Sequence, residues 1–292
     1  MQEKLLVQSC ASAADPEYRA QMVKFNGDAI PFLEFFTKEG IRVLQKDVVN
    51  SCHGNNALTA RLAADVQGLA DQGHKIVSIQ SGGLYFAKPS LEAAQMPTVP
   101  VISVPLNGGY FNGEDAFLAP SVPSGTAVIG GVGMGRYDTA ARVAKEILAR
   151  EFEGVYVFNA NDRLMKRLEE LGVPVIGESM HDAVNGLMLY LMRDDQDYLN
   201  GQDYMNVRHI DGNVALTVFS FPKSAQTLDA MQFCDGLGNS VFVRGEENLA
   251  YFAAKIMSSY NRKAFYALKA AAEKKAASYE DRRIDMDSFG RL

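Results

Sequence analysis

Short apolar runs recur along the chain, and most are followed by small or polar residues and then by an amphipathic segment. The runs predict strands at 5–7, 41–44, 75–79, 100–104, 127–129, 154–158, 173–176, 214–219 and 241–243. The amphipathic segments predict helices at about 16–36, 57–71, 140–148, 163–171, 248–258 and 262–279. Apolar strands separated by helices are typical of a parallel sheet covered on both faces, so the predicted fold class is α/β.

Landmarks in the first part of the chain return in the same order in the second. The correspondences are a loop between strand and helix (51–53 with 179–181), a proline-bounded strand (99–105 with 215–222), a further strand (124–130 with 238–245) and the helix after it (140–148 with 249–257). Any α/β chain repeats strand–loop–helix units, but four landmarks in one order favour a tandem duplication with an internal pseudo-two-fold. We therefore predict two α/β halves and a C-terminal helix with its tail, at 1–150, 151–260 and 261–292.

Composition limits the class of protein. Apolar residues make up 47% of the chain and charged residues 22%, the proportions of a globular protein rather than a disordered one. The formal charge of -6 argues against a general nucleic-acid binder, and no apolar run is long enough to span a membrane. Cys10, Cys52 and Cys234 are too scattered for a disulfide framework or a metal knuckle, and the first residues lack a signal-peptide layout. We expect a soluble, reduced, cytoplasmic protein.

Loops at the carboxyl ends of parallel strands are where ligands of such sheets bind. His53 lies in one of these loops and can exchange a proton near neutral pH, which suits a general acid or base; the alternative is a histidine that only hydrogen-bonds. Cys10 and Cys52 precede helices, where a thiolate is favoured, although small buried packing residues are the simpler interpretation. The turn Ser81-Gly82-Gly83 would let backbone amides approach an anion, but paired glycines also serve turn geometry alone.

A second interpretation starts from the glycine-rich segment 130–135, which follows a predicted strand and precedes a helix. A dinucleotide-binding loop would lie there, and Asp162, after the next strand, would bind the ribose. The spacing is G-x-G-x-G and position 136 is Arg, so the fingerprint is incomplete. A dinucleotide-dependent oxidoreductase is therefore the less favoured alternative.

Taken in order, the loops resemble the 5-(carboxyamino)imidazole ribonucleotide mutases and aminoimidazole ribonucleotide carboxylases of purine biosynthesis. That family has a serine-rich first loop, an S-A-H loop, a Gly-Gly turn, a V-P-V strand ending in proline, a P-x-G strand and an alanine-rich helix. The matching segments are 9–12, 51–54, 81–83, 99–105, 123–129 and 140–148. The likeness runs from residue 4 to about 150, and the family's terminal helices reappear at 248–257 and 262–279.

The resemblance implies a flavodoxin-like, three-layer fold that forms a homo-oligomer and needs no metal or organic cofactor. It implies an isomerase or lyase that transfers carboxylate on a small phosphorylated substrate, without nucleic acid or membrane partners. His53 would shuttle the proton. The residues implied in substrate binding are Ser9, Cys10, Ser12, Ser51, Ser81, Gly82 and Gly83.

The chain departs from the family at two charged positions. Ala13 replaces the family aspartate, and Gly54 replaces the Arg or Lys after the histidine. Lys88 is the candidate that restores the lost positive charge. The second half offers a possible second site, with residues Asn161, Asp162, Ser179 and His181. Alternatively, Asp162, Arg163 and His181 complete the first site. A non-catalytic relative, or one reassigned to another nucleotide or anion, is the alternative function.

Overall fold

The computed structural model describes residues 2–10, 31–47, 56–83, 92–106, 125, 127–128, 137–179, 181–192, 213–221 and 237–280. These residues form one sheet of ten strands in the order β2-β1-β3-β4-β5-β10-β9-β8-β6-β7. The strands of the first half are β1 (Lys4–Cys10), β2 (Ile41–Asp47), β3 (Lys75–Gly83), β4 (Val101–Leu106) and β5 (Ala127–Val128). Those of the second are β6 (Val155–Phe158), β7 (Val175–Gly177), β8 (Leu187–Leu191), β9 (Leu216–Phe221) and β10 (Ser240–Arg244).

Each half of the sheet has the same strand order. Numbered from its own first strand, each runs 2-1-3-4-5, the order of flavodoxin, and every pairing inside a half is parallel. The halves join at the centre, where Val128 of β5 forms one antiparallel pair with Phe242 of β10. The α/β class and the flavodoxin-like parallel sheet in two equivalent halves are confirmed. The domain boundaries at residues 150 and 260 stay a prediction.

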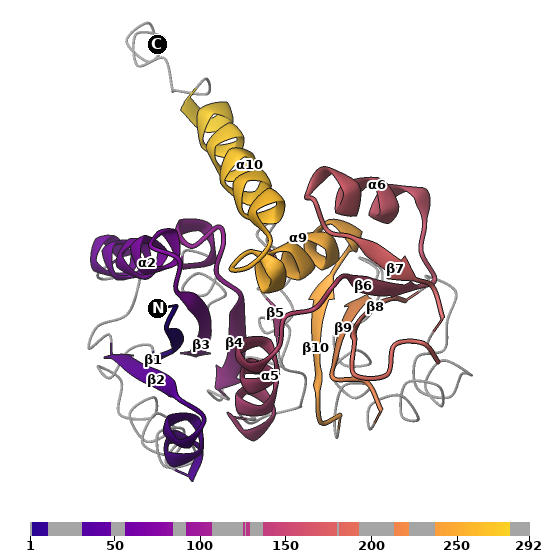
Figure 1. The fold of residues 1–292 in the computed structure, drawn as a ribbon. Helices are drawn as coiled ribbons and strands as arrows, with labels where there is room; N and C mark the ends of the chain where they lie inside the picture. Colours follow the sequence, from indigo (N-terminus) through magenta and orange to yellow (C-terminus); the bar gives the residue numbers. More distant parts are fainter. Residues whose placement is uncertain are drawn as a thin grey trace, which may run out of the picture.

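Helices cover both faces of the sheet (Figure 1). The labelled helices are α2 (Asn56–Asp71), α5 (Tyr137–Ala149), α6 (Asp162–Glu170), α9 (Glu246–Met257) and α10 (Arg262–Glu280), and a short helix lies at 31–38. In the first half α5 and the helix at 31–38 lie on one face, and α2 lies on the other. Helix α5 buries Tyr137, Ala140, Ala144 and Ile147, an apolar stripe at helical spacing that fixes which side it turns to the strands.

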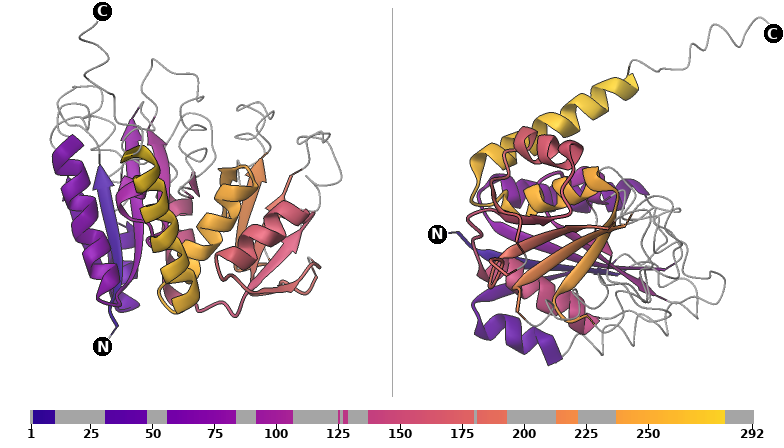
Figure 2. Two further views of the ribbon diagram at one scale, coloured as in Figure 1. Left: turned by 90° about the horizontal axis from the view of Figure 1, so that it is seen from above. Right: turned by 90° about the vertical axis from the view of Figure 1, so that its right-hand side faces the viewer.

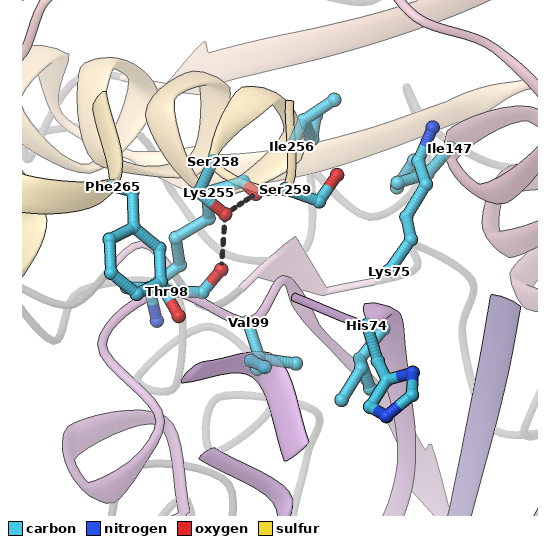
Figure 3. A pocket seen from close by; sticks show the side chains of 12 residues that line it. His74, Lys75, Thr98, Val99, Ile147, Lys255, Ile256, Ser258, Ser259 and Phe265 are labelled. Carbon is cyan, nitrogen blue, oxygen red and sulfur yellow. Dashed lines mark hydrogen bonds between the residues drawn. The ribbon is translucent and has the colours of Figure 1, made fainter. Parts of the chain in front are cut away.

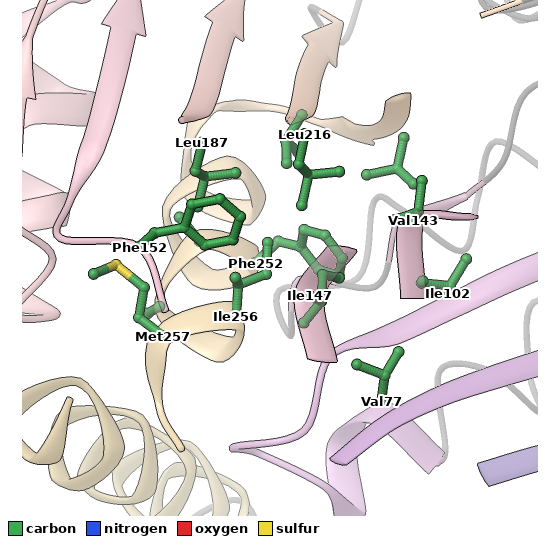
Figure 4. Packing of buried hydrophobic residues seen from close by; sticks show 14 of the residues in the cluster. Val77, Ile102, Val143, Ile147, Phe152, Leu187, Leu216, Phe252, Ile256 and Met257 are labelled. Atoms are coloured by element: carbon green, nitrogen blue, oxygen red, sulfur yellow. The ribbon is translucent and has the colours of Figure 1, made fainter. Parts of the chain in front are cut away.

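One apolar core runs through both halves. Val77 of β3 and Ile147 of α5 belong to the same cluster as Leu216 of β9 and Phe252 of α9 (Figure 4). All four side chains are at most 1% exposed. Helices α5 and α9 therefore both contribute to one core that crosses the junction of the two halves.

The C-terminal helix α10 lies outside α9, and its last turns extend away from the sheet (Figure 2). Its buried residues Ala264 and Leu268 pack toward the body, and Lys269 forms an ion pair with Asp71 of α2 at 2.7 Å. Its first turns contact elements of both halves of their own chain.

Strand β8 is absent from the sequence prediction, and its neighbourhood explains why. The loop with Ser179 and His181 follows β7 as predicted, but it enters β8 after a turn rather than a helix, so that part of the prediction is wrong. Asn185 has a φ of 60°, which ends any helix there. A Cβ on Gly186 would lie 2.8 Å from the Tyr156 ring, so this glycine lets β6 and the turn approach closely.

Candidate functional site

Register places the carboxyl ends of the first-half strands side by side. Cys10, the last residue of β1, pairs with Ser81 of β3 on one side and with Asp47, the last residue of β2, on the other. The predicted binding segments at 9–10 and 81–83 therefore lie on neighbouring strands. Ser12, Ser51, His53 and Lys88, with Ala13 and Gly54, lie outside the described residues.

The Gly-Gly segment is strand rather than turn, so the predicted turn at 81–83 is wrong. Strand β3 continues to its end at Gly83, where Gly82 pairs with Pro105 and Gly83 with Leu106 of β4. Within the described residues, β3 pairs with β1 as far as Ser81. The segment stays extended because it pairs with β4.

A buried polar row lies under this edge, on the face that α2 covers. Gln80 of β3 pairs in register with Ser9 of β1 and with Ser103 of β4. Ser78, Gln80 and Ser103 are all buried, and the Gln80 Nε2 donates to the Ser78 Oγ at 3.5 Å. The sequence analysis missed these three residues. Their signal was available: Ser78 and Gln80 interrupt an apolar strand at a spacing of two, which puts both on one face.

The second half carries aromatic residues in the equivalent row. Phe158, Tyr190, Phe219 and Phe242 pair in register across β6, β8, β9 and β10. The Phe158 and Tyr190 ring centroids are 4.8 Å apart, and those of Tyr190 and Phe219 are 5.6 Å apart. Aromatic pairs at this spacing stabilise a core. The two halves thus share a strand order but differ in chemistry under their carboxyl ends.

The candidate residues of the second half lie after β6 and β7, which are neighbours in the sheet. Asn161 is the N-cap of α6: its Oδ1 accepts a hydrogen bond from the Leu164 backbone N–H at 2.8 Å. The Ser179 Oγ accepts one from the His181 N–H at 3.2 Å, and the side chains of Asp162 and His181 are exposed. The hydrogen bonds of Asn161 and Ser179 hold the local backbone, as capping and turn residues do.

Replacing Asn161 with alanine is expected to cost about 1 kcal/mol of folding free energy, because the first turn of α6 loses its capping acceptor. Urea denaturation of the variant and of Asn161→Asp measures it. Aspartate keeps an acceptor at the same position, so Asn161→Asp should retain most of the stability. Equal losses in the two variants would contradict the capping role.

Residues of the second half do not complete the first-half site within one chain, so that expectation is wrong. Seven strand spacings of about 4.8 Å separate β1 from β6, which places their ends on the order of 30 Å apart. Arg163 forms an ion pair with Glu246 at 3.0 Å instead. Asp162 lines an open groove beside α6 that also contains Lys166, Glu169 and Lys263. The groove therefore has two acidic and two basic side chains.

The strand order also opposes the dinucleotide alternative. A dinucleotide fold needs the strand before the glycine loop and the strand before the ribose-binding acid to be neighbours. Here β10, β9 and β8 lie between β5 and β6. Asp162 therefore cannot reach a ligand bound after β5. The glycine-rich segment 130–135 itself lies outside the described residues.

Two buried lysines lie at the other end of the strands, where the halves meet (Figure 3). The Lys255 Nζ of α9 is 3.4 Å from the Ala93 carbonyl oxygen, and burial lowers the pKa of Lys255 to about 7. Burial also lowers the pKa of Lys75 to about 8; its Nζ donates to the Arg150 carbonyl and lies 4.9 Å from the centroid of the Tyr260 ring. Burial raises the pKa of the Tyr260 hydroxyl to about 12.

The cavity lined by these lysines is a junction rather than a substrate site. The Ser258 hydroxyl donates to the Thr98 carbonyl at 2.6 Å, which ties the end of α9 to the chain before β4. The space inside is about 10 Å³, room for at most one water molecule. The contacts bind the two halves together.

Metal and membrane features are absent from the part of the chain that the structure describes. No group of three His, Cys, Asp or Glu side chains is placed there to hold a metal ion. No helix among those residues is both long and apolar enough to cross a bilayer. In comparisons with known proteins, no family model and no curated protein matches the chain.

Proposed function

We propose that the chain transfers carboxylate on an aminoimidazole ribonucleotide, or on a similar small phosphorylated substrate, at the carboxyl ends of β1, β2 and β3. The observation that carries the proposal is the register of Cys10 with Ser81 and Asp47, from whose strands the three motif-bearing segments continue. The buried polar row lies under the same edge. We place the site in the first half because the family-like motifs and the buried polar row occur together there.

In the mutase direction, the bond between the exocyclic nitrogen and the carboxylate carbon breaks, and a bond forms between that carbon and the ring carbon. The ring carbon loses a proton, and the nitrogen gains one. His53 takes the first proton and returns it to the nitrogen. Serine hydroxyls and the glycine backbone bind the phosphate and carboxylate, as hydroxyls and amides bind anions elsewhere.

Replacing His53 with asparagine is expected to lower turnover by about 10² to 10⁴, the usual contribution of a general acid or base. Binding should survive, because the phosphate contacts remain. The measurements are an absorbance assay for carboxylate transfer and the thermal shift produced by aminoimidazole ribonucleotide. His74→Asn is the matched control, since His74 lies beside Glu3 at the amino end of β3. Retained turnover in His53→Asn would remove this residue from the mechanism.

The alternative is a relative that kept the fold and binds another nucleotide or anion. Ala13 and Gly54, which remove two charged groups of the family, favour it. A thermal shift with other phosphate compounds, and none with the imidazole ribonucleotides, would support this alternative. Loss of turnover in His181→Asn would instead place the reaction in the second half.

A further inference from the structure

Gln80 is a buried polar residue with an unmet hydrogen-bonding requirement. Its side chain is 0% exposed, and its Oε1 has no hydrogen-bond partner within the described part of the chain. Its Nε2 has the Ser78 hydroxyl at 3.5 Å, the outer limit of such a bond. An unpaired buried acceptor destabilises the folded protein. Packing alone would favour an apolar residue, as in the aromatic row of the second half.

Gln80 lies on β3 below the strand end at which the site is proposed. Gln80 lies three residues before the end of β3 at Gly83, which is about 10 Å at the rise of a strand. The next residue of β3 on the same face is Gly82, which has no side chain. Within the described residues, β1 pairs with β3 as far as Ser81. No side chain of β3 itself therefore lies between Gln80 and the carboxyl edge on this face.

We infer that Gln80 determines specificity at the proposed site by accepting, through its Oε1, a hydrogen bond from an N–H group of the ligand. The ligand class is an amine-bearing heterocycle attached to a sugar phosphate. This inference rests on the proposed function, and it names the feature of the substrate that the buried row recognises. Ligands that carry the phosphate but no N–H donor leave the acceptor unpaired, and the site binds them more weakly.

The test compares three ligands on the full chain by calorimetry: aminoimidazole ribonucleotide, imidazole ribonucleotide without the exocyclic amine, and ribose 5-phosphate. In the wild type the amine should tighten binding about tenfold over imidazole ribonucleotide, the usual effect of one hydrogen bond. Gln80→Met keeps the length of the side chain and removes the acceptor. It should weaken aminoimidazole ribonucleotide binding about tenfold and leave ribose 5-phosphate binding unchanged.

The matched control is Ser220→Ala. Ser220 of β9 is also fully buried, and its Oγ also has no partner in the described structure, but it lies in the second half. Ser220→Ala should leave all three affinities unchanged. If Gln80→Met does not fold, Gln80→Leu, which also removes the acceptor, takes its place in the same comparison.

The outcomes separate the two claims. Equal wild-type affinities for the two imidazole ribonucleotides, or an unchanged affinity in Gln80→Met, would overturn the role of Gln80 and leave the proposed function standing. Weaker binding of all three ligands to Gln80→Met would also overturn it, since that is the mark of a purely structural residue. No binding of either imidazole ribonucleotide to the wild type would overturn both claims.

Discussion

Replacing Lys255 with methionine is expected to stabilise the protein by a few kcal/mol, most strongly below pH 7. Burial and the nearby charge of Lys275 lower the pKa of Lys255 from 10.5 to about 7. The unfolded chain therefore binds one more proton than the folded chain between these pH values. Stability of the wild type should rise with pH across that window, and the full cost of charging Lys255 applies below it.

The measurement is urea denaturation of the wild type and Lys255→Met at pH 6, 8 and 10. The gain from the substitution should be largest at pH 6 and should shrink toward pH 10. In Lys255→Met, stability should still rise with pH, but less steeply, because the pKa of Lys75 is also lowered, to about 8. Lys166→Met is the control, because Lys166 is exposed on α6. A gain that does not change with pH would show that Lys255 is not charged on unfolding as described.

Replacing Gly125 with alanine is expected to destabilise the protein by about 3 kcal/mol or more. Gly125 has a φ of +64°, and an added Cβ would lie 2.7 Å from the backbone nitrogen of Phe252 and 2.9 Å from the Tyr251 Cβ. Its N–H also donates to the Asn248 Oδ1 at 3.4 Å. The contact joins the chain before β5 to α9, so a shift there separates the two halves at the centre of the sheet.

Gly73→Ala is the control that measures backbone strain without a steric clash. Gly73 also has a positive φ, +91°, but an added Cβ would meet no heavy atom within 4 Å. Gly73→Ala should lose about 1 kcal/mol of folding free energy, because only the left-handed backbone conformation is strained. Thermal denaturation of both variants measures the difference. Equal losses would mean that α9 moves freely to admit the extra methyl group.

The parts of the fold that follow from local pattern were predictable. Each apolar run that stands between polar loops became a strand, and the periodic segment at 140–148 became α5. Strand β8 was missed because the turn before it depends on a contact between Gly186 and Tyr156, far apart in the sequence. The segment at 81–83 was predicted as a turn because paired glycines permit one, whereas β4 decides the outcome by pairing with it.

Only the part of the candidate site that lies at the ends of strands could be predicted from the sequence. The sequence predicted that the segments of Ser9 and Ser81 lie at strand ends, and register brings those two segments together. Gln80 was overlooked because a single polar residue in an apolar strand has no meaning until its face and neighbours are known. The prediction that Asp162 completes the first-half site was wrong for a similar reason. The order of strands in the sheet depends on contacts between residues far apart in the sequence, which the local pattern does not show.

The core shared by α5 and α9 makes unfolding a single cooperative event. Ile147 of the first half and Phe252 of the second are buried in one cluster that runs through both halves. Amide hydrogens of β3 and β9 should therefore exchange with one common free energy of opening, rather than in two steps.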